Sequence, residues 1–377
     1  MPPLADLRPE EAVLCLAART VVDPAAAAAL EARLTGGLDW ERLWRLSHRH
    51  EVVPLVTTTL TGLARPDGPW AVPADWVAAA GRRRIATLLK NRAMLGALRD
   101  LLSALEVAGV EAMPVKGLVL AGRLYGDLGL RPAGDIDLLV RREQLPAARS
   151  VLAELGYRQS VRPSYEERHH AFHDAPYFRT DANGEICVEL HWGLAAPAQF
   201  RLDIAGAWER SQRVEVFDMP VRVLSDVDTL VHLAVHRTRS ALRMRWIVDI
   251  AELVRLMPAA DWPLALDTAR AAGARTALAV ALDLSDRLLD APVPDDVRAH
   301  LTISPLKRSL LERTCGVAAM FPAVDRPDDD AQPHLTYRVF EQDGAGRIAR
   351  SLAATAVRKA DKWRDRRRLR TAPPVTD

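Results

Sequence analysis

The chain has 377 residues, of which 49% are hydrophobic and 27% charged, and its formal net charge is +2 at pH 7. These values are ordinary for a soluble globular protein, and the length allows two or three domains. Acidic residues interrupt positions 1–20, and no later window is long and apolar enough to cross a bilayer, so neither a signal peptide nor a membrane-spanning segment is expected. Three distant cysteines without metal-ligand spacing predict a reduced, cytoplasmic setting.

Residues 1–108 are predicted to form an N-terminal helical region. Short helices are expected up to residue 63, beginning at Pro9, after Asp23 and after Asp39. A Pro/Gly-rich linker covers residues 64–73. The apolar stripe of residues 74–108 then predicts one long helix or two abutting ones, with arginines on the other faces.

Residues 109–224 are predicted to form a small mixed sheet with helices. The apolar run 112–115 is typical of a buried strand, and Lys116-Gly117 follows at its end. Residues 118–128 have helical spacing and are followed by Gly129, Pro132 and Gly134, which end a helix. A second buried strand then begins at Asp135 and ends at Val140.

The rest of this region predicts a helix over 141–156, a strand over 157–162 and a hairpin within 169–192 that turns at 181–184. Two further strands, 214–217 and 221–224, are expected as a hairpin at the edge of the sheet. His169, His170 and His173 form a cluster at the start of the first hairpin, near the expected site, and either hydrogen-bond phosphate or face solvent.

Residues 225–377 are predicted to be a C-terminal helical region. Ser225 is a good N-cap for its first helix, and a loop is expected over 322–333. The tail 347–370 carries ten Lys/Arg and two Asp, so nucleic acid could bind there, although a solvated basic helix is the commoner reading of such a run.

Three carboxylates are the main candidates for chemistry. Residues i and i+2 of a strand share a face, so Asp135 and Asp137 point the same way. Glu189 stands on a later strand, and His191 shares its face. Carboxylates that lie together repel one another unless a cation sits between them, and Mg²⁺ prefers oxygen ligands. A lysine-glycine turn, a paired-Asp strand and a later single acid are typical of nucleotidyl transfer.

At these residues the sequence resembles the polymerase-β-like nucleotidyltransferases, and within them the branch called uncharacterised nucleotidyltransferase. The resemblance covers about residues 40–256 and rests on motifs in order: Lys116-Gly117, Tyr125, Arg131, Asp135 to Val140, and Glu189 to Trp192. A downstream helical pattern of His236, Arg243, Trp246 and Asp249 completes it. Lys-Gly stands where the wider superfamily usually has Gly-Ser or Gly-Gly, and Asp135 follows nineteen positions after Lys116.

The resemblance implies an α+β fold with flanking helical regions and a metal-dependent transfer of a nucleoside monophosphate. Asp135, Asp137 and Glu189 would hold two Mg²⁺ ions, with an NTP, expected to be ATP, as co-substrate. Lys116, Gly117, Tyr125, Arg131 and His191 would surround the nucleotide. The acceptor stays open, since a small molecule, an RNA end or a protein hydroxyl would all fit.

Other functions stay open at this stage. A glycosyltransferase also uses Asp-x-Asp to hold a nucleotide-sugar, but would not require Glu189 or the Lys-Gly turn. A haloacid-dehalogenase-type phosphatase needs a threonine or a similar residue where Leu139 stands. The non-enzymatic alternative is a nucleotide-binding sensor or scaffold, which the presence of all three acids disfavours.

Overall fold

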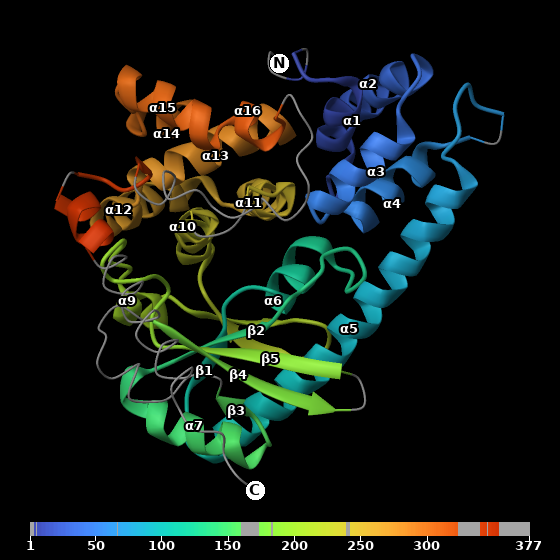
Figure 1. Cartoon of the computed structure of the whole chain (residues 1–377). Coiled ribbons are helices and arrows are strands. Elements are labelled where there is room, and N and C mark those ends of the chain that lie inside the picture. Colours follow the sequence, from blue (N-terminus) through green and yellow to red (C-terminus); the bar gives the residue numbers. More distant parts are fainter. Residues whose placement is uncertain are drawn as a thin grey trace, which may run out of the picture.

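Helices surround a five-stranded mixed sheet in the computed structural model of the chain (Figure 1). The structure describes residues 4, 6–65, 67–159, 173–181, 184–238, 242–322, 340–344 and 346–353. The α+β class with flanking helices, expected from the sequence, is confirmed. Within the described residues, no helix is both long and apolar enough to cross a bilayer.

Four short helices open the chain. They are α1 (Pro9–Ala17), α2 (Pro24–Thr35), α3 (Trp40–Arg49) and α4 (Val53–Leu63). Asp23 and Asp39 accept hydrogen bonds from the first-turn amides of α2 and α3, which satisfies donors that a helix start otherwise leaves open. The predicted starts of these helices are therefore confirmed.

Helix α5 (Ala74–Val107) is one continuous helix of 34 residues, and it joins the two halves of the molecule. It packs against α4 near its beginning and against α7 (Leu145–Glu154) and the sheet near its end. Figure 1 shows it running along one side from the N-terminal helices to the sheet.

The sheet has the order β1-β2-β5-β4-β3. The strands are β1 (Ala112–Pro114), β2 (Ile136–Val140), β3 (Arg158–Gln159), β4 (Asp174–Asp181) and β5 (Gly184–His191). β2 and β5 are parallel, and the other pairs are antiparallel. The expected hairpin within 169–192 is confirmed as β4–β5, whereas residues 160–172 and 182–183 lie outside the described part.

The two faces of the sheet are covered differently. Ile136 and Leu138 belong to a hydrophobic core that includes the second half of α5 and α7. On the opposite face, Leu139 packs in a small cluster with Trp208 of α9 (Ile204–Glu209). Because Asp137 alternates with Ile136 and Leu138, its side chain emerges on this second face, close to the end of the cluster.

Two predicted elements differ from the structure. The helix expected over 118–128 is a single turn, α6 (Leu118–Leu120), that widens into a π-helical turn (Ala121–Tyr125) and ends at Gly126 in the left-handed region. The expected edge hairpin is present as β6 (Gln212–Glu215) and β7 (Pro220–Val223), but it forms a sheet of its own beside β1. Pro114 and Pro220 lack an N–H donor, which disfavours a ladder between β1 and β7.

The C-terminal half is helical as predicted. Its helices are α10 (Asp226–Arg237), α11 (Met244–Leu256), α12 (Trp262–Ala272), α13 (Arg275–Leu289), α14 (Asp295–His300), α15 (Pro305–Cys315) and α16 (Val317–Met320). Ser225 caps α10, as expected. The predicted loop 322–333 and most of the basic tail lie outside the described residues, although 346–353 are helical.

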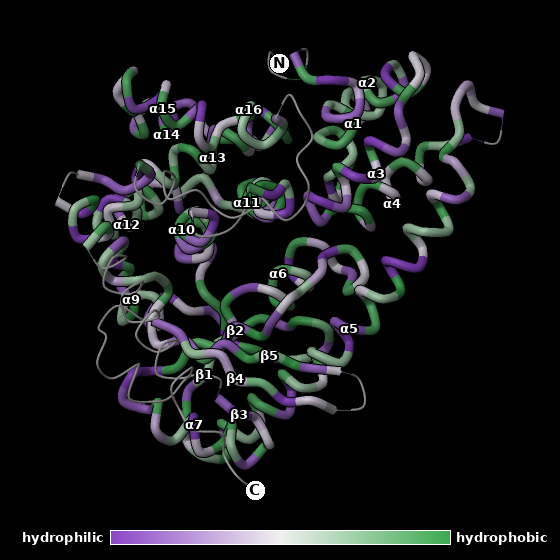
Figure 2. The backbone as a smooth tube through the Cα atoms, in the orientation of Figure 1, coloured by the Kyte–Doolittle hydropathy of each residue, from purple (hydrophilic) through white to green (hydrophobic). Residues whose placement is uncertain are grey.

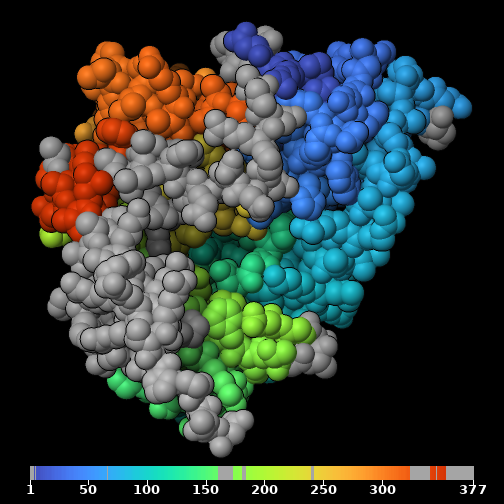
Figure 3. Space-filling model, viewed as in Figure 1, coloured from blue at the N-terminus to red at the C-terminus, as the bar shows by residue number. Residues whose placement is uncertain are grey.

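The first four helices and the C-terminal helices share one hydrophobic core. They lie together above the sheet in the space-filling view (Figure 3), and hydrophobic positions mark the strands at the centre of the lower half (Figure 2). In this arrangement α10 and α11 lie over the face of the sheet that carries Asp137. A pocket lies between these two helices and the sheet.

Candidate active site

The register of the sheet brings the candidate carboxylates together. Asp137 of β2 lies directly beside Glu189 of β5, and Leu139 lies beside His191. Residues at the same level of neighbouring strands point to the same face, so Asp137, Glu189 and His191 converge. On the other side of β5, Asp174 pairs with His191 and adds a further acid to the same corner.

The Lys-Gly turn closes this group from the end of β1. Gly117 has φ +59° and ψ −111°, and a Cβ built there would lie 3.3 Å from the carbonyl oxygen of Asp135. A residue with a side chain would be strained at this φ, which explains the glycine. The turn directs Lys116 inward, so that its Nζ lies 2.8 Å from Asp137 Oδ1.

The Asp137 side chain is fully buried, and only one of its two carboxylate oxygens has polar contacts among the described residues. Its Oδ1 also lies 3.0 Å from His191 Nε2, whereas its Oδ2 has no hydrogen-bond partner among the described residues. Burial favours the neutral acid, but Lys116 and His191 outweigh it and hold the pKa of Asp137 well below its usual range. Asp137 is therefore a charged carboxylate with one oxygen open to a further cation.

The neighbouring groups respond to the same charges. Burial lowers the pKa of His191, but its contacts with Asp137 and Glu189 raise it to about 10. Burial, reinforced by repulsion from Asp137, raises the pKa of Asp135 to about 6. Burial also opposes the charge on Lys116, yet Asp137 and Asp135 keep its pKa above the usual value. Such displaced values cluster at functional sites.

A pocket of about 340 Å³ opens over these residues, a volume typical of small-molecule sites. The strands and turns contribute Lys116, Gly134, Asp135, His173, Asp174, Glu189, His191 and Leu194 to its lining. Helices α10 and α11 contribute His232, Val235, His236, Arg245 and Trp246. The structure thus brings together Lys116, Asp135, Glu189 and His191 of the predicted site, with Asp137 beneath them.

The wall formed by α10 and α11 is aromatic and basic. The rings of His236 and Trp246 lie edge to face with centroids 4.8 Å apart, and the Arg245 guanidinium lies 4.1 Å from the Trp246 ring centroid. His232 Nδ1 lies 3.1 Å from the Leu194 carbonyl oxygen. Burial, together with the nearby charges of Lys116 and His191, lowers the pKa of His232 to about 3, so this ring is neutral.

Sequence reasoning did not single out Asp174, Arg245 or His232 for the site. Asp174 and His232 have no local motif, and only the strand register and the docking of α10 reveal them. For Arg245, a usable signal was its position between Arg243 and Trp246, which the family resemblance had marked. His169 and His170 lie outside the described residues, and Arg243 pairs with Glu51 away from the pocket lining.

Tyr125 and Arg131 lie elsewhere than the resemblance implied. Arg131 Nε and Nη2 donate to the two carboxylate oxygens of Asp249, at 2.8 and 2.7 Å, and Nη1 donates to the carbonyl oxygen of Gly117 at 3.1 Å. The Tyr125 hydroxyl donates to Asp249 at 2.8 Å. Neither residue lines the pocket. They join the Lys-Gly turn to α11 through a buried ion pair.

The donor set fits a divalent cation. Asp137, Glu189 and His191 each offer one ligand atom, and these atoms lie within 4.8 Å of one another. Asp137 Oδ2, which has no partner within the part of the chain that the structure describes, is a buried anionic oxygen, and such an oxygen in a folded protein calls for a partner. Asp135 adds a fourth donor residue in the pocket lining.

Comparisons with known proteins bear on this site. No curated protein matches the chain. Among solved structures, the antibiotic-resistance factor ANT(2'')-Ia is similar over 48% of this chain and 92% of its own, at 15% identity and TM-score 0.35. An antigenic nucleotidyltransferase-like protein from Paracoccidioides brasiliensis is similar over 53% of this chain and 88% of its own, at 16% identity and TM-score 0.35. These likenesses are too remote to carry weight.

The family comparison is decisive. Residues 36–290 match the family described as uncharacterised nucleotidyltransferase, a stretch that contains α3 to α13, the whole sheet and the pocket. The chain therefore belongs to the uncharacterised nucleotidyltransferase family.

Proposed function

We propose that the protein transfers a nucleoside monophosphate from a nucleoside triphosphate, ATP in the first instance, to a hydroxyl group of an acceptor molecule. The observation that carries this proposal is the placement of Asp137 beside Glu189 across two parallel strands, beneath the pocket and with one carboxylate oxygen that no described residue contacts by a hydrogen bond. Family membership supports the reaction class, and the charges in the pocket support a metal-bound triphosphate.

Asp137, Glu189 and Asp135 are the residues that would hold Mg²⁺, two ions in the proposed reaction. Bound there, the metal would neutralise the phosphate oxygens and lower the pKa of the acceptor hydroxyl. Burial and then the charges of Asp137 and Glu189 raise the pKa of Asp135, and a cation would remove the repulsion among these carboxylates. Lys116, tied to Asp137, adds a point charge at the same end of the pocket.

The pocket walls suit a nucleotide. Trp246 adds an aromatic ring that matches a base, and Arg245, which also pairs with Glu51 at 2.8 Å and donates to the Pro132 carbonyl oxygen, adds a cation beside that ring. In place of the phosphate contacts implied by the resemblance, we assign Arg131 and Tyr125 a positioning role, because their contacts hold Asp249 and the Gly117 carbonyl.

The reaction would be an in-line displacement. The acceptor oxygen forms a bond to the α-phosphorus, the bond from that phosphorus to the leaving oxygen breaks, and pyrophosphate departs. Glu189 is the group we assign to take the proton of the hydroxyl, because its side chain is one-third exposed and lines the pocket. His191, 3.4 Å from Glu189 Oε2, orients that carboxylate.

The test uses the purified full chain with Mg²⁺ and each nucleoside triphosphate labelled at the α-phosphate, in the presence of a size-fractionated cell extract. Transfer predicts a labelled acceptor and an equal amount of pyrophosphate. The Asp137→Asn variant is the matched control and should give neither product. Tight nucleotide binding with no labelled product in any fraction would instead favour a nucleotide sensor.

A further inference from the structure

His191 has two different environments at its two ring nitrogens. Its Nε2 lies 3.0 Å from Asp137 Oδ1 and 3.4 Å from Glu189 Oε2. Its Nδ1 is buried and has no hydrogen-bond partner among the described residues. Because Nε2–H donates to carboxylates, Nδ1 is the nitrogen that a metal ion would bind, with release of the proton that it carries, and a metal-binding histidine is commonly held by such a contact at its other nitrogen.

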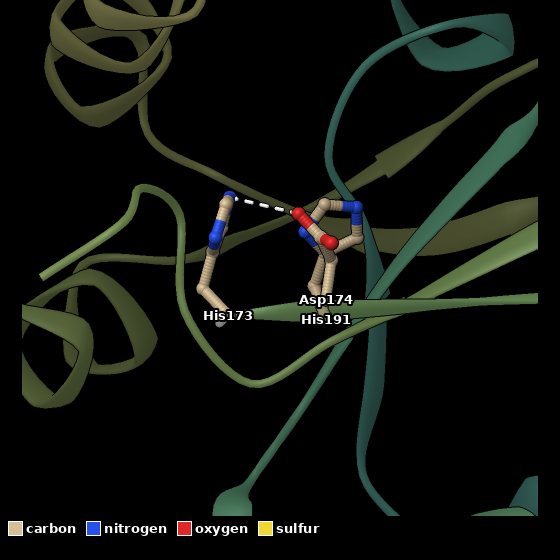
Figure 4. Close-up of side chains that lie close together, drawn as sticks. All are labelled: His173, Asp174 and His191. Atoms are coloured by element: carbon tan, nitrogen blue, oxygen red, sulfur yellow. Dashed lines mark ion pairs between the residues drawn. The ribbon is translucent and has the colours of Figure 1, made fainter. Parts of the chain in front are cut away.

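A histidine and an aspartate lie on the opposite side of the ring from Asp137. Asp174 pairs with His191 across β4 and β5, and His173 precedes it. His173 Nε2 lies 3.0 Å from Asp174 Oδ2, and the rings of His173 and His191 have centroids 5.8 Å apart. Figure 4 shows one nitrogen of the His191 ring on the side of His173 and Asp174 and the other nitrogen on the far side.

We propose that His173, Asp174 and His191 form a second cation site, separate from the carboxylate site at Asp137 and specific for a divalent ion that prefers imidazole, such as Zn²⁺. One donor atom from each residue lies within 4.8 Å of the others. Two imidazole nitrogens and one carboxylate oxygen are a donor set of zinc sites and a poor one for Mg²⁺, which prefers oxygen.

The geometry favours a site with one open position. In a tetrahedral zinc site, bonds of about 2.0–2.1 Å place ligand atoms roughly 3.3 Å apart, close to the separation of His173 Nε2 and Asp174 Oδ2. All three residues also line the pocket. Three protein ligands leave the fourth position for water or an oxygen of a bound molecule, as in catalytic zinc sites. Zn²⁺ binding at these residues requires no nucleotidyl transfer.

The test is metal binding to the full chain after removal of metal with a chelator. Titration with Co²⁺, a spectroscopic substitute for Zn²⁺, should give visible absorption bands typical of four-coordinate nitrogen and oxygen ligation, and Zn²⁺ should displace it. His173→Gln and Asp174→Asn should each weaken Zn²⁺ binding by at least about tenfold, the loss seen on disturbing a metal site. The exposed His300→Gln is the matched control and should bind like the wild type.

Two results would overturn the proposal. One is unchanged Zn²⁺ affinity in both His173→Gln and Asp174→Asn. The other is loss of Zn²⁺ in Glu189→Gln but not in His173→Gln, which would place the ion at Asp137, Glu189 and His191. The wild-type Co²⁺ spectrum needs no variant, so poor folding of a mutant leaves the test intact. Mg²⁺-dependent ATP binding measured on the chelator-treated wild-type chain, without Zn²⁺, separates this proposal from the proposed function, because that measurement does not involve the second site.

Discussion

Two buried aspartates, Asp137 and Asp249, show how the same type of ion pair can serve different ends. Both side chains are fully buried, and each lies against a basic residue, Lys116 for Asp137 and Arg131 for Asp249. Both oxygens of Asp249 are hydrogen-bonded, through Arg131 and Tyr125. Asp137 has one oxygen beneath a pocket without a hydrogen-bond partner among the residues that the structure describes.

The difference separates a structural charge from a functional one. A saturated, bidentate pair such as Arg131–Asp249 has no capacity for another ligand, so its effect is to hold α11 against the Lys-Gly turn. The lysine contact with Asp137 is a point charge that satisfies one oxygen only. Asp137, whose carboxylate keeps an open oxygen, is the one that can bind a cation. We therefore expect Asp249→Asn to lose mainly stability and Asp137→Asn to lose mainly activity.

The largest effect is expected on stability. Asp249→Asn leaves the buried Arg131 charge without its counter-charge, and breaking such a pair costs about 3–5 kcal/mol. Urea denaturation should show this loss in the free energy of unfolding. Asp137→Asn should cost less than Asp249→Asn, because Asp135 and Glu189 still act on the buried Lys116 and leave that charge with nearby counter-charges.

Replacing Arg131, Asp249 and Tyr125 together tests whether the stability lost in Asp249→Asn comes from an unpaired charge. The triple variant Arg131→Met, Asp249→Leu, Tyr125→Phe removes the polar groups of all three side chains at once, while the Gly117 carbonyl oxygen keeps its hydrogen bond from the Ala121 amide, so it should recover most of the stability lost in Asp249→Asn. A triple variant as unstable as Asp249→Asn would contradict the view that the loss comes from an unpaired charge.

Next in size is the effect of Asp137→Asn on turnover. Loss of the carboxylate that holds the cation should lower single-turnover nucleotidyl transfer by about 10²–10³-fold, the range for removing one group that stabilises transition-state charge. The measurement is rapid-quench analysis of labelled product, with thermal melting as the control for folding. Near-wild-type rates would place the metal elsewhere.

Glu189→Gln should separate binding from turnover. The amide keeps the shape but accepts no proton, so transfer should fall about hundredfold. Nucleotide affinity should change little, since Asp137 and Asp135 remain. Single-turnover rates and calorimetric affinities on one preparation check this, and an unchanged rate would leave Glu189 as a strand residue without a catalytic role.

The smallest effect is expected from the basic tail. Ser351 is buried and hydrogen-bonded by Gln199, so a truncation after Ala353 keeps that contact while removing the remaining residues. ATP affinity should stay within about twofold, because the described pocket residues all precede position 247. A larger loss of ATP binding in the truncated chain would show that the tail reaches the site.

Much of the core could be predicted from the sequence. Strand alternation placed Asp137 opposite Ile136 and put Glu189 on the same face as His191, and the parallel pairing of β2 with β5 brings these faces together. The N-caps at Asp23, Asp39 and Ser225 could also be predicted, because an N-cap side chain accepts a hydrogen bond from an amide only two or three residues later in the chain. The boundaries at 108 and 224 stay a prediction.

The partner of each charge could not be predicted. Arg131 meets Asp249 across 118 positions of sequence, and nothing local distinguishes that pairing from a contact with phosphate. Asp174 enters the site because β4 pairs with β5, and Arg245 because α11 docks over the sheet. Tertiary packing decides which basic residue is used for structure and which faces the pocket.

The central claim is that Asp137 holds a cation needed for nucleotide binding. Calorimetric titration of wild type and Asp137→Asn with ATP, with and without Mg²⁺, tests it most directly, with Asp249→Asn measured below its melting temperature for comparison. We predict that Mg²⁺ strengthens ATP binding in wild type and in folded Asp249→Asn but not in Asp137→Asn. Equal Mg²⁺-dependent affinity in wild type and Asp137→Asn would contradict the claim.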